Sequence, residues 1–271
     1  MVDPEFVIPA DRLPPGFAQS IDKPVDDPPE PKPAATVVLL RDGDAGMEVL
    51  LLKRHRSSGF VPGAYVFPGG RTDEADAQEE LKQFSENFEP REVPHHFWFA
   101  AVREVFEETG VLLARDARDF WVGDTSTDPE MEKLRLELMD NQASLLDVLT
   151  QANCRVDFSA IVYFAHWITP VAEPRRYDTR FFAAALPHDR EARPDAREMT
   201  DAVWLTPKLA LSRFKEGTLP MVFPTVRTLE QLTHFESVAQ ALDYLRTRNV
   251  EPVLPRLVRT DAGVGIVIDP K

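Results

Sequence analysis

Short apolar runs broken by Gly, Pro and Asp alternate along the chain with segments whose apolar residues recur at helical spacing. Two strands are predicted at 34–40 and 47–54, because two apolar runs are joined there by Asp and Gly residues. The joining segment, 42–46, has residue types of a calcium loop but lacks the full spacing and the terminal Glu, so we expect a hairpin turn. A further short strand within 64–70 runs into a Pro-Gly-Gly break.

Helices are predicted where apolar residues repeat every three or four positions. The main helix covers 95–110 and ends at Gly110, a residue type that favours helix C-termini. A helix over 134–149 is predicted from the spacing of its leucines, whose face we assign to core packing. The remaining predicted elements are a short helix within 73–88, strands at 160–168, 179–185, 202–205 and 264–268, and helices at 207–214 and 225–247. Interleaved strands and helices favour a layered α/β or α+β domain.

The first 33 residues differ in texture from the rest. They hold many of the prolines among scattered acidic residues, with too little apolar periodicity for a core element. We therefore expect a mostly extended arm at 1–33.

Composition and charge narrow the class of protein. With 271 residues, 43% of them hydrophobic, the chain can bury a substantial core. A formal net charge of -14 repels polyanions and argues against nucleic-acid binding, so a small anionic ligand needs a local basic pocket or bound cations. No secretory signal and no membrane-spanning apolar run are evident, which predicts a cytoplasmic protein without membrane contact. Cys154 is the only cysteine, which excludes intrachain disulfides and a Cys-based zinc site.

The predicted main helix carries an unusual concentration of carboxylates. Glu104, Glu107 and Glu108 fall within an arc of roughly 100° of the helix, beside an apolar arc of about 140°. Like charges at this spacing destabilise a helix by a few tenths of a kcal/mol each in water, and by more when partly buried. Arg103 can pair with one carboxylate, and a divalent cation with hard oxygen ligands would neutralise the rest. A solvated acidic surface is the alternative, but the adjoining apolar arc and the upstream glycines favour a binding site.

The run REVFEETGV at 103–111 is identical to the second half of the Nudix box. The first half is Gly70 followed by Asp76, where the usual box has Glu, and an insertion at about 77–96 separates the halves. This split box resembles the Nudix branch that includes the peroxisomal coenzyme A diphosphatases. Three further segments resemble the same branch: 50–70, 166–182, and the strand and helix that start at 198.

The resemblance implies an α/β fold: a Nudix-type α/β/α sandwich with a mixed sheet, a helical insertion inside the box and a C-terminal helical extension. It divides the chain into a Pro-rich arm at 1–33, a hydrolase domain at 34–235, and a C-terminal helix and tail at 236–271 packed on that domain. A homodimer is family precedent, and no self-complementary patch can be identified in the sequence.

The resemblance also assigns roles within the box. Glu104 and Glu108 would bind Mg²⁺, with Mn²⁺ as the alternative, and Glu107 would be a further ligand or a neighbouring acid. Gly70, or Gly69 before it, would offer a backbone carbonyl. Arg103 would orient the carboxylates, and Asp76 is one methylene shorter than the usual Glu.

The implied reaction is attack of water on the diphosphate of a nucleoside diphosphate linked to another group. Bound cations neutralise the phosphate oxygens and lower the pKa of the attacking water. For the general base we expect Glu198, with Glu104 as the alternative. The leading small-molecule substrate is coenzyme A or an acyl derivative, the alternatives are ADP-ribose, NADH and nucleotide sugars, and a catalytically silent nucleotide sensor is the competing class.

The net charge of the chain is negative, so a pocket for an anion would have to be formed by a local group of basic residues. A surface salt bridge is the commoner role of any single basic residue, but a converging group could hold phosphates. His95 and His96 are poor candidates for metal ligands, because neighbours on a helix point about 100° apart. The candidates for substrate binding are Lys53, Arg54, Arg71, Arg175, Arg176 and Arg180.

Overall fold

The computed structural model of the chain describes residues 4–13, 16–22, 27–57, 61–88, 93–122, 125, 128–186 and 190–268. Two compact units make up the protein. The terminal unit consists of Met1–Pro33, Ala165–Thr179 and Val250–Lys271, and the central unit consists of Ala34–Phe164 and Arg180–Asn249. Parts of the predicted arm and of the predicted insertion lie outside the described residues.

The central unit is built on a sheet with the strand order β11-β3-β2-β10-β9. Strands β2 and β3 form an antiparallel hairpin whose register runs from Leu40↔Val49 to Gly43↔Gly46, which confirms the predicted turn. Two short strands, β4 and β5, pair with β3 and β2. The strands are β2 (Lys32–Gly43), β3 (Gly46–Arg54), β4 (Tyr65–Val66), β5 (Gly69–Arg71), β9 (Ile161–Ile168), β10 (Tyr177–Ala185) and β11 (Met199–Leu205).

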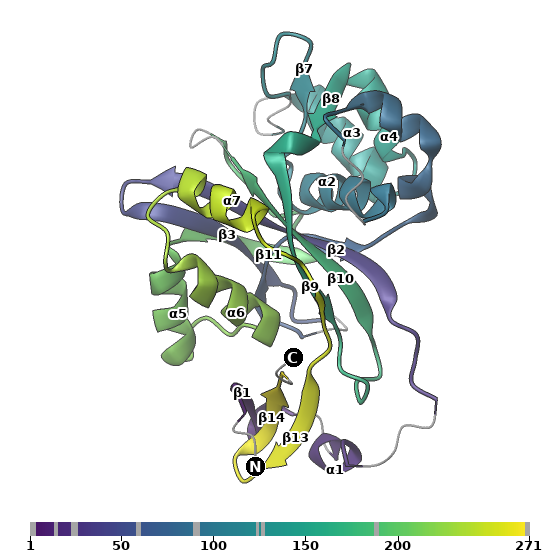
Figure 1. The fold of residues 1–271 in the computed structure, drawn as a ribbon. Coiled ribbons are helices and arrows are strands. Elements are labelled where there is room, and N and C mark those ends of the chain that lie inside the picture. The colour runs from purple at the N-terminus through teal and green to yellow at the C-terminus, as the bar shows by residue number, and fades with distance from the viewer. Residues whose placement is uncertain are drawn as a thin grey trace. The chain divides into compact units, whose positions relative to one another are not determined.

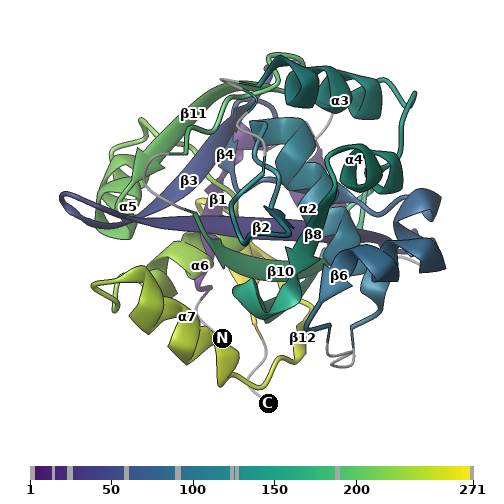
Figure 2. The same ribbon diagram turned by 90° about the horizontal axis from the view of Figure 1, so that it is seen from above.

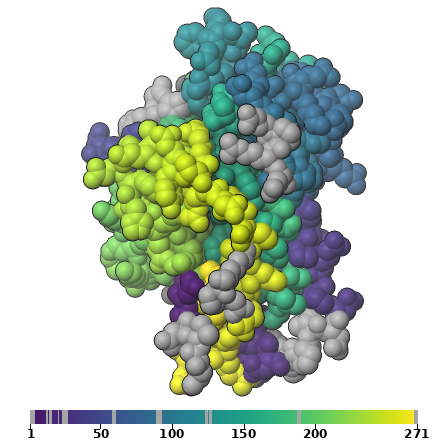
Figure 3. Space-filling model, viewed as in Figure 1, coloured from purple at the N-terminus to yellow at the C-terminus, as the bar shows by residue number. Residues whose placement is uncertain are grey.

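Helices cover both faces of this sheet, as Figures 1 and 2 show. On one side lie α2 (His95–Thr109), α3 (Pro129–Met139) and α4 (Leu145–Gln151). On the other side lie α5 (Pro207–Lys215), α6 (Phe223–Leu232) and α7 (Val238–Arg246), which form one closely packed yellow-green surface in Figure 3. The predicted α/β/α sandwich is therefore confirmed.

The core of the central unit lies between α2 and the sheet. Phe99 and Phe106 of α2 are fully buried together with Leu39 and Leu50 of the sheet. Fully burying a side chain of this size stabilises the fold by about 1.5–3 kcal/mol. Packing on this scale fixes both the position and the rotation of α2.

The inserted segment carries short elements of its own. The predicted helix within 73–88 consists of two 3-10 helices, η2 (Glu74–Ala77) and η3 (Glu79–Phe84). Strand β6 (Ser85–Glu86) then pairs with β8 (Cys154–Asp157), and β7 (Arg115–Asp116) pairs with the same strand. A further 3-10 helix, η4 (Phe158–Ala160), follows β8. Leu81 is fully buried, so the insertion is anchored by packing.

Two predicted helices are wrong as single elements. The segment 134–149 contains the end of α3 and the start of α4, and Asn141 between them adopts a left-handed φ of 55°. Ser144 starts α4 with a capping box to Asp147, which satisfies backbone groups that a continuous helix would use itself. The segment 225–247 is likewise divided, because Ser237 caps the start of α7.

The terminal unit contains a small sheet with the order β1-β14-β13. The predicted last strand is confirmed as β14 (Gly263–Val267), and it pairs with both β1 (Phe6–Pro9) and β13 (Arg256–Thr260). The predicted arm is thus not irregular throughout, since it contributes a strand. The remaining elements are η1 (Ala10–Arg12), α1 (Phe17–Ser20) and β12 (Pro252–Val253). The predicted division at 33 and 235 stays a prediction.

None of the helices in the described ranges has both the length and the hydropathy that crossing a membrane requires.

Substituting Gly110 tests the end of α2. A Cβ there would lie 2.2 Å from Thr125 Oγ1 and 3.1 Å from Arg135 Nη1, and the backbone φ is +72°. The φ strain alone costs about 1–2 kcal/mol for an L-residue, so we expect Gly110→Ala to lower the free energy of unfolding by more than that. The matched control is Gly63→Ala, because Gly63 has a φ of +74° and no atom within 4 Å. Equal losses in urea denaturation would mean that no steric clash exists at Gly110.

Candidate functional site

The acidic arc of α2 lies against the two glycines of β5. The Gly69 amide donates a hydrogen bond of 2.9 Å to Glu108 Oε2. A Cβ on Gly70 would lie only 2.5 Å from Glu104 Oε2. The glycines therefore let both carboxylates reach the backbone of the sheet, which a larger residue would prevent.

Arg103 is the hub of the site, and its side chain is only 6% exposed. Its Nε and Nη2 atoms donate to the two carboxylate oxygens of Asp76, each at 3.0 Å. Nη1 donates to Glu104 Oε1 at 2.8 Å and to Glu107 Oε2 at 3.0 Å. Nη2 also donates to the carbonyl of Arg71 at 2.7 Å. One guanidinium thus joins both halves of the split motif.

Asp76 reaches Arg103 although it is shorter than the usual Glu. It is fully buried and stands at the third position of η2. Its Oδ2 accepts the Asp73 amide at 2.7 Å, which completes a capping box with Asp73. The insertion follows this bidentate contact, and so it leaves the pairing of the two half-motifs intact.

The three glutamates together carry more negative charge than the single positive charge of Arg103 can neutralise. Burial raises the pKa of Glu104 to about 8 against the opposing effect of Arg103. Burial and the charge of Glu104 raise the pKa of Glu108, while the Gly69 amide and Arg54 oppose them. Burial also raises the pKa of Glu107. Burial alone would lower the pKa of Arg103, but its carboxylate neighbours raise it.

The donors suit a hard divalent cation in their chemistry. Within the described residues, no three His, Cys, Asp or Glu side chains converge on one point that could hold a metal. Arg103 donates to one oxygen each of Glu104 and Glu107, and the Gly69 amide donates to one oxygen of Glu108. The second oxygen of each carboxylate makes no hydrogen bond to the described residues, so a modest rotation would present oxygen ligands.

Four of the predicted basic residues belong to the central unit with this site. Arg54 ends β3, and its charge acts on Glu108. Lys53 precedes it, with Nζ 5.5 Å from the centroid of the Tyr65 ring. Arg71 is exposed beside the Gly pair. Arg180 belongs to β10 and lies near the N-terminal end of α2, where its Cζ is 4.6 Å from the ring centroid of Phe97.

Arg175 and Arg176 belong to the terminal unit. The side chain of Arg176 is directed to backbone, since Nε donates to Thr169 O at 3.1 Å and Nη1 donates to Pro29 O at 2.9 Å. These contacts give Arg176 a structural role in that unit. Arg175 is exposed. Substrate binding by either residue stays a prediction.

Glu198 lies in a turn that enters β11, and its side chain is exposed. Its carbonyl accepts the His55 amide at 2.8 Å, which ties the turn to the end of β3. Asp195 Oδ1 accepts the Glu198 amide at 2.6 Å and the Met199 amide at 3.2 Å. Asp195 also raises the pKa of Glu108, so its charge is felt at the site.

The sequence interpretation missed Asp195. An Asp that opens a short polar segment before a strand is a signal for a side-chain turn and could have indicated it. General-base catalysis by Glu198 stays a prediction. The two histidines lie at the other end of α2, where His95 Nε2 is 3.2 Å from the carbonyl oxygen of Ala77.

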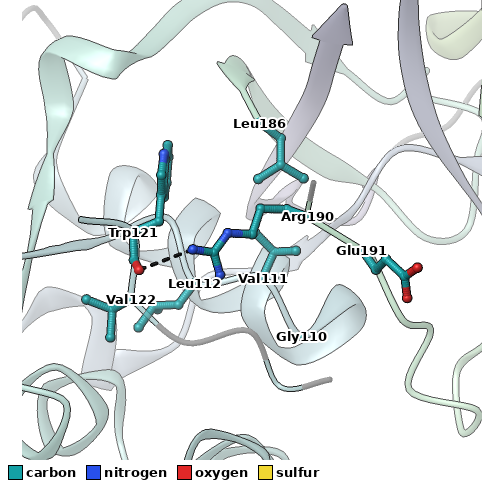
Figure 4. Close-up of a pocket in the computed structure, with 8 residues that line it drawn as sticks. All are labelled: Gly110, Val111, Leu112, Trp121, Val122, Leu186, Arg190 and Glu191. Carbon is teal, nitrogen blue, oxygen red and sulfur yellow. Dashed lines mark hydrogen bonds between the residues drawn. The ribbon is translucent and has the colours of Figure 1, made fainter. Parts of the chain in front are cut away.

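A pocket lies beyond the C-terminal end of α2 (Figure 4). It has an empty volume of about 250 Å³ that includes open solvent. Arg190 Nη2 donates to Trp121 O at 3.3 Å across it. Its lining residues include none of the predicted site residues, so it is separate from the acidic arc. They are Gly110, Val111, Leu112, Trp121, Val122, Leu186, Arg190 and Glu191.

Comparisons with known proteins place this geometry in a family. Residues 82–232 match the NUDT19 Nudix domain. The chain is 29% identical over 244 residues to the acyl-coenzyme A diphosphatase NUDT19 of Xenopus laevis, covering 75% of this chain and 64% of that protein. It is 26% identical over 263 residues to the human protein of the same name, covering 81% and 70%. The chain thus spans 64% of the length of the frog protein and 70% of that of the human protein.

A solved structure is similar to this one over most of the chain. The NUDIX hydrolase of Alicyclobacillus acidocaldarius has a TM-score of 0.70 and 30% identity, and the match covers 81% of this chain and 99% of the other.

Removing the charge of Asp76 should destabilise the central unit strongly. Asp76→Asn leaves Arg103 with Glu104 and Glu107 but removes its bidentate acceptor, and a buried donor without its acceptor costs about 1–3 kcal/mol, so we expect the free energy of unfolding to fall by about that amount. The control is Glu48→Gln, which breaks the more exposed ion pair of Arg41 and Glu48, whose N–O distance is 2.8 Å. That control should cost about 1 kcal/mol or less. Urea denaturation would measure both, and a small loss for Asp76→Asn would show that Arg103 finds other partners.

The stability of the protein in EDTA should fall as the pH rises. The pKa of Glu104 is about 8 in the folded protein against an ordinary value of 4.5. The folded state favours the protonated carboxyl, so this stabilisation is complete below about pH 4.5 and is lost as the pH rises through about 8.

The matched variant for this pH effect is Glu104→Gln, which cannot ionise. It should show a smaller decline in the free energy of unfolding between about pH 6 and about pH 8.5, and it should be the more stable protein at the higher pH. Urea denaturation in EDTA measures the difference. Parallel curves for both proteins would place the titration elsewhere.

Proposed function

Because this chain belongs to the NUDT19 Nudix domain family, we propose that it is a Mg²⁺-dependent hydrolase of diphosphate bonds. The substrate would be a nucleoside diphosphate linked to another group, with coenzyme A or an acyl-coenzyme A as the leading candidate. The names of the relatives in frog and human support that choice. The observation that carries the proposal is the pair of carboxylates of Glu104 and Glu108 packed against a glycine pair, where burial raises the pKa of both and the charge of Glu104 raises that of Glu108 further.

Some residues of the motif would bind the metal ion, and Arg103 would orient the carboxylates that bind it. Glu104 and Glu108 would hold Mg²⁺, with Glu107 as a further ligand or a neighbouring acid. When bound, the ion would neutralise phosphate oxygens and lower the pKa of the attacking water. Arg103 would keep the carboxylates of Glu104 and Glu107 in place, because it already donates to both.

Substrate charge would be met by the basic residues at the end of β3. Arg54 acts on Glu108 and so stands near the acids that would anchor a diphosphate. Lys53 precedes it in β3, and because side chains alternate along a strand it faces the other side of the sheet, with Nζ 5.5 Å from the centroid of the Tyr65 ring. Arg71 follows the glycine pair directly. Arg54 and Arg71 are the strongest candidates for phosphate contacts, and Lys53 and Arg180 are weaker ones.

The attacking water needs a proton acceptor. Glu198 is an exposed carboxylate in a turn that is bonded to the end of β3, and it would take the proton at its carboxylate oxygen. Glu104 is the alternative, because its raised pKa favours accepting a proton near neutral pH.

A substrate panel tests the proposal. The protein is incubated with Mg²⁺ and, in separate reactions, coenzyme A, an acyl-coenzyme A, ADP-ribose, NADH and a nucleotide sugar. Hydrolysis of coenzyme A at the diphosphate would yield phosphopantetheine and an adenosine phosphate, both detectable by liquid chromatography. Binding without turnover of every compound would favour a nucleotide sensor over an enzyme.

The variant Glu108→Gln should remove most of the turnover. It replaces a charged oxygen ligand by a neutral amide of the same size, so kcat/KM with Mg²⁺ should fall by about 100- to 1,000-fold. The melting temperature should not fall, because the residue makes no core contact that the amide lacks. Glu48→Gln is the control and should keep full activity. Unchanged turnover of Glu108→Gln would contradict the assignment of Glu108 as a metal ligand.

A further inference from the structure

Arg135 of α3 is a buried cation outside the motif. Its side chain is 4% exposed, and it lies on the face of α3 that also buries Met131 and Leu138. Nε donates to the carbonyl of Glu107 at 2.9 Å, and Nη2 donates to the carbonyl of Arg193 at 2.9 Å. The same guanidinium thus contacts the motif helix and a segment far from it in sequence.

The contact with α2 is at the helix end. The last carbonyls of a helix lack intrahelical partners, and a cation there also interacts favourably with the helix dipole. Arg135 takes the Glu107 carbonyl, and the Arg193 amide donates to the Thr109 carbonyl at 2.7 Å. The segment that begins at Arg193 is therefore joined to the last turn of α2 twice, once directly and once through Arg135.

The same segment forms the turn that carries Glu198. Ala196 adopts a φ of +61°, which non-glycine residues rarely do. The Ala196 amide donates to the Met199 carbonyl at 3.0 Å, and Asp195 Oδ1 accepts the amides of Glu198 and Met199. A turn with an unfavourable backbone conformation persists only where its surroundings hold it.

If the side chain at position 135 served only to fill the core, an apolar residue would stabilise the protein more than an arginine does. Burying a guanidinium is costly unless hydrogen bonds repay the lost hydration. Glu132 offers a partner on the same helix, with Oε2 at 3.5 Å from Nη1. The two shorter bonds go to backbone carbonyls of two different segments, the end of α2 and the segment before β11, so the guanidinium joins them.

We propose that Arg135 is a positioning residue that holds the 195–198 turn, and the Glu198 it carries, at a fixed place against the C-terminal end of α2. This inference rests on the proposed function for its kinetic part, since it assumes that Glu198 receives the proton of the attacking water. Its structural part concerns the turn alone and does not depend on any substrate.

Two variants and one control separate this role from simple stabilisation. Arg135→Met removes both hydrogen bonds, and Arg135→Lys keeps the charge with a donor that can reach one carbonyl at a time. Leu138→Ala is the matched control, because Leu138 is buried on the same helix and contributes packing without these bonds.

The first measurement is hydrogen exchange of the amides of Glu198 and Met199 in the full chain without ligand. We expect their protection to fall by about tenfold or more in both Arg135 variants and to change little in Leu138→Ala beyond the global loss of stability. Unchanged protection in Arg135→Met would overturn the proposal whatever the activity shows.

The second measurement is the kinetics of the substrate identified by the panel. We expect kcat to fall by about 10- to 100-fold in Arg135→Met, with an intermediate value in Arg135→Lys and little change in KM or in the Mg²⁺ concentration for half-maximal rate. Leu138→Ala should lower the melting temperature with kcat within about twofold of the unmodified protein.

Each remaining outcome has its own meaning. A fall in kcat that runs parallel to a loss of Mg²⁺ affinity would show that Arg135 acts through the carboxylates of α2, which overturns the assignment to the turn. An equal fall in kcat for Leu138→Ala would reduce the effect to stability and overturn it as well. If the unmodified protein hydrolyses no compound of the panel, the proposed function fails, and hydrogen exchange still decides whether Arg135 holds the turn.

Discussion

The buried guanidinium of Arg103 is the constraint on which the site depends. It donates to Asp76, to Glu104 and Glu107, and to the carbonyl of Arg71, so it joins the loop after β5 to the motif helix. A buried ion pair adds little stability compared with apolar packing, yet breaking one is costly because a charge is left without a partner. The ion pairs therefore fix the positions of these carboxylates mainly because any arrangement that separated a carboxylate from Arg103 would leave a buried charge unpaired.

This constraint explains how the motif tolerates a long insertion. Asp76 precedes the inserted residues and Arg103 follows them, and their two direct hydrogen bonds hold the ends of the insertion together. Lengthening a loop costs only about 0.6 kcal/mol for each doubling of its length. The insertion also offsets part of that cost by burying Leu81 and by pairing β6 with β8. It can thus vary in length without moving the carboxylates of α2.

Local signals in the sequence sufficed for the motif helix, the first hairpin and the glycine pair, because each depends on residues close together in the chain. The break between α3 and α4 was missed although Ser144 and Asp147 form a capping box, since the leucine periodicity runs across it. Asp195 was missed although its position before a strand is a signal for a side-chain turn, and Arg135 could not be found in this way. The importance of Arg135 comes from its hydrogen bonds to the carbonyls of Glu107 and Arg193, which lie far from it in the sequence. The effect of Asp195 on the pKa of Glu108 is likewise a long-range one.

The charge balance of the site links its parts to one another. Arg103 is shared among Asp76, Glu104 and Glu107, and Glu108 is left with the Gly69 amide and the more distant charge of Arg54. Asp195 adds a further negative charge on that side. A diphosphate that approached these acids without a cation would be repelled, and a bound cation would offset that repulsion.

In the proposed site, cation and substrate therefore favour each other's binding, because each neutralises charge that opposes the other. The protein's part in this coupling is to keep the acids close together at a free-energy cost, through burial and through Arg103, until both ligands are present. Exposed glutamates would repel one another only weakly, so binding a cation would lower their electrostatic free energy by less. The raised pKa values of Glu104 and Glu108, caused first by burial and then by neighbouring carboxylates, express that cost, and the packing of α2 on the sheet maintains it.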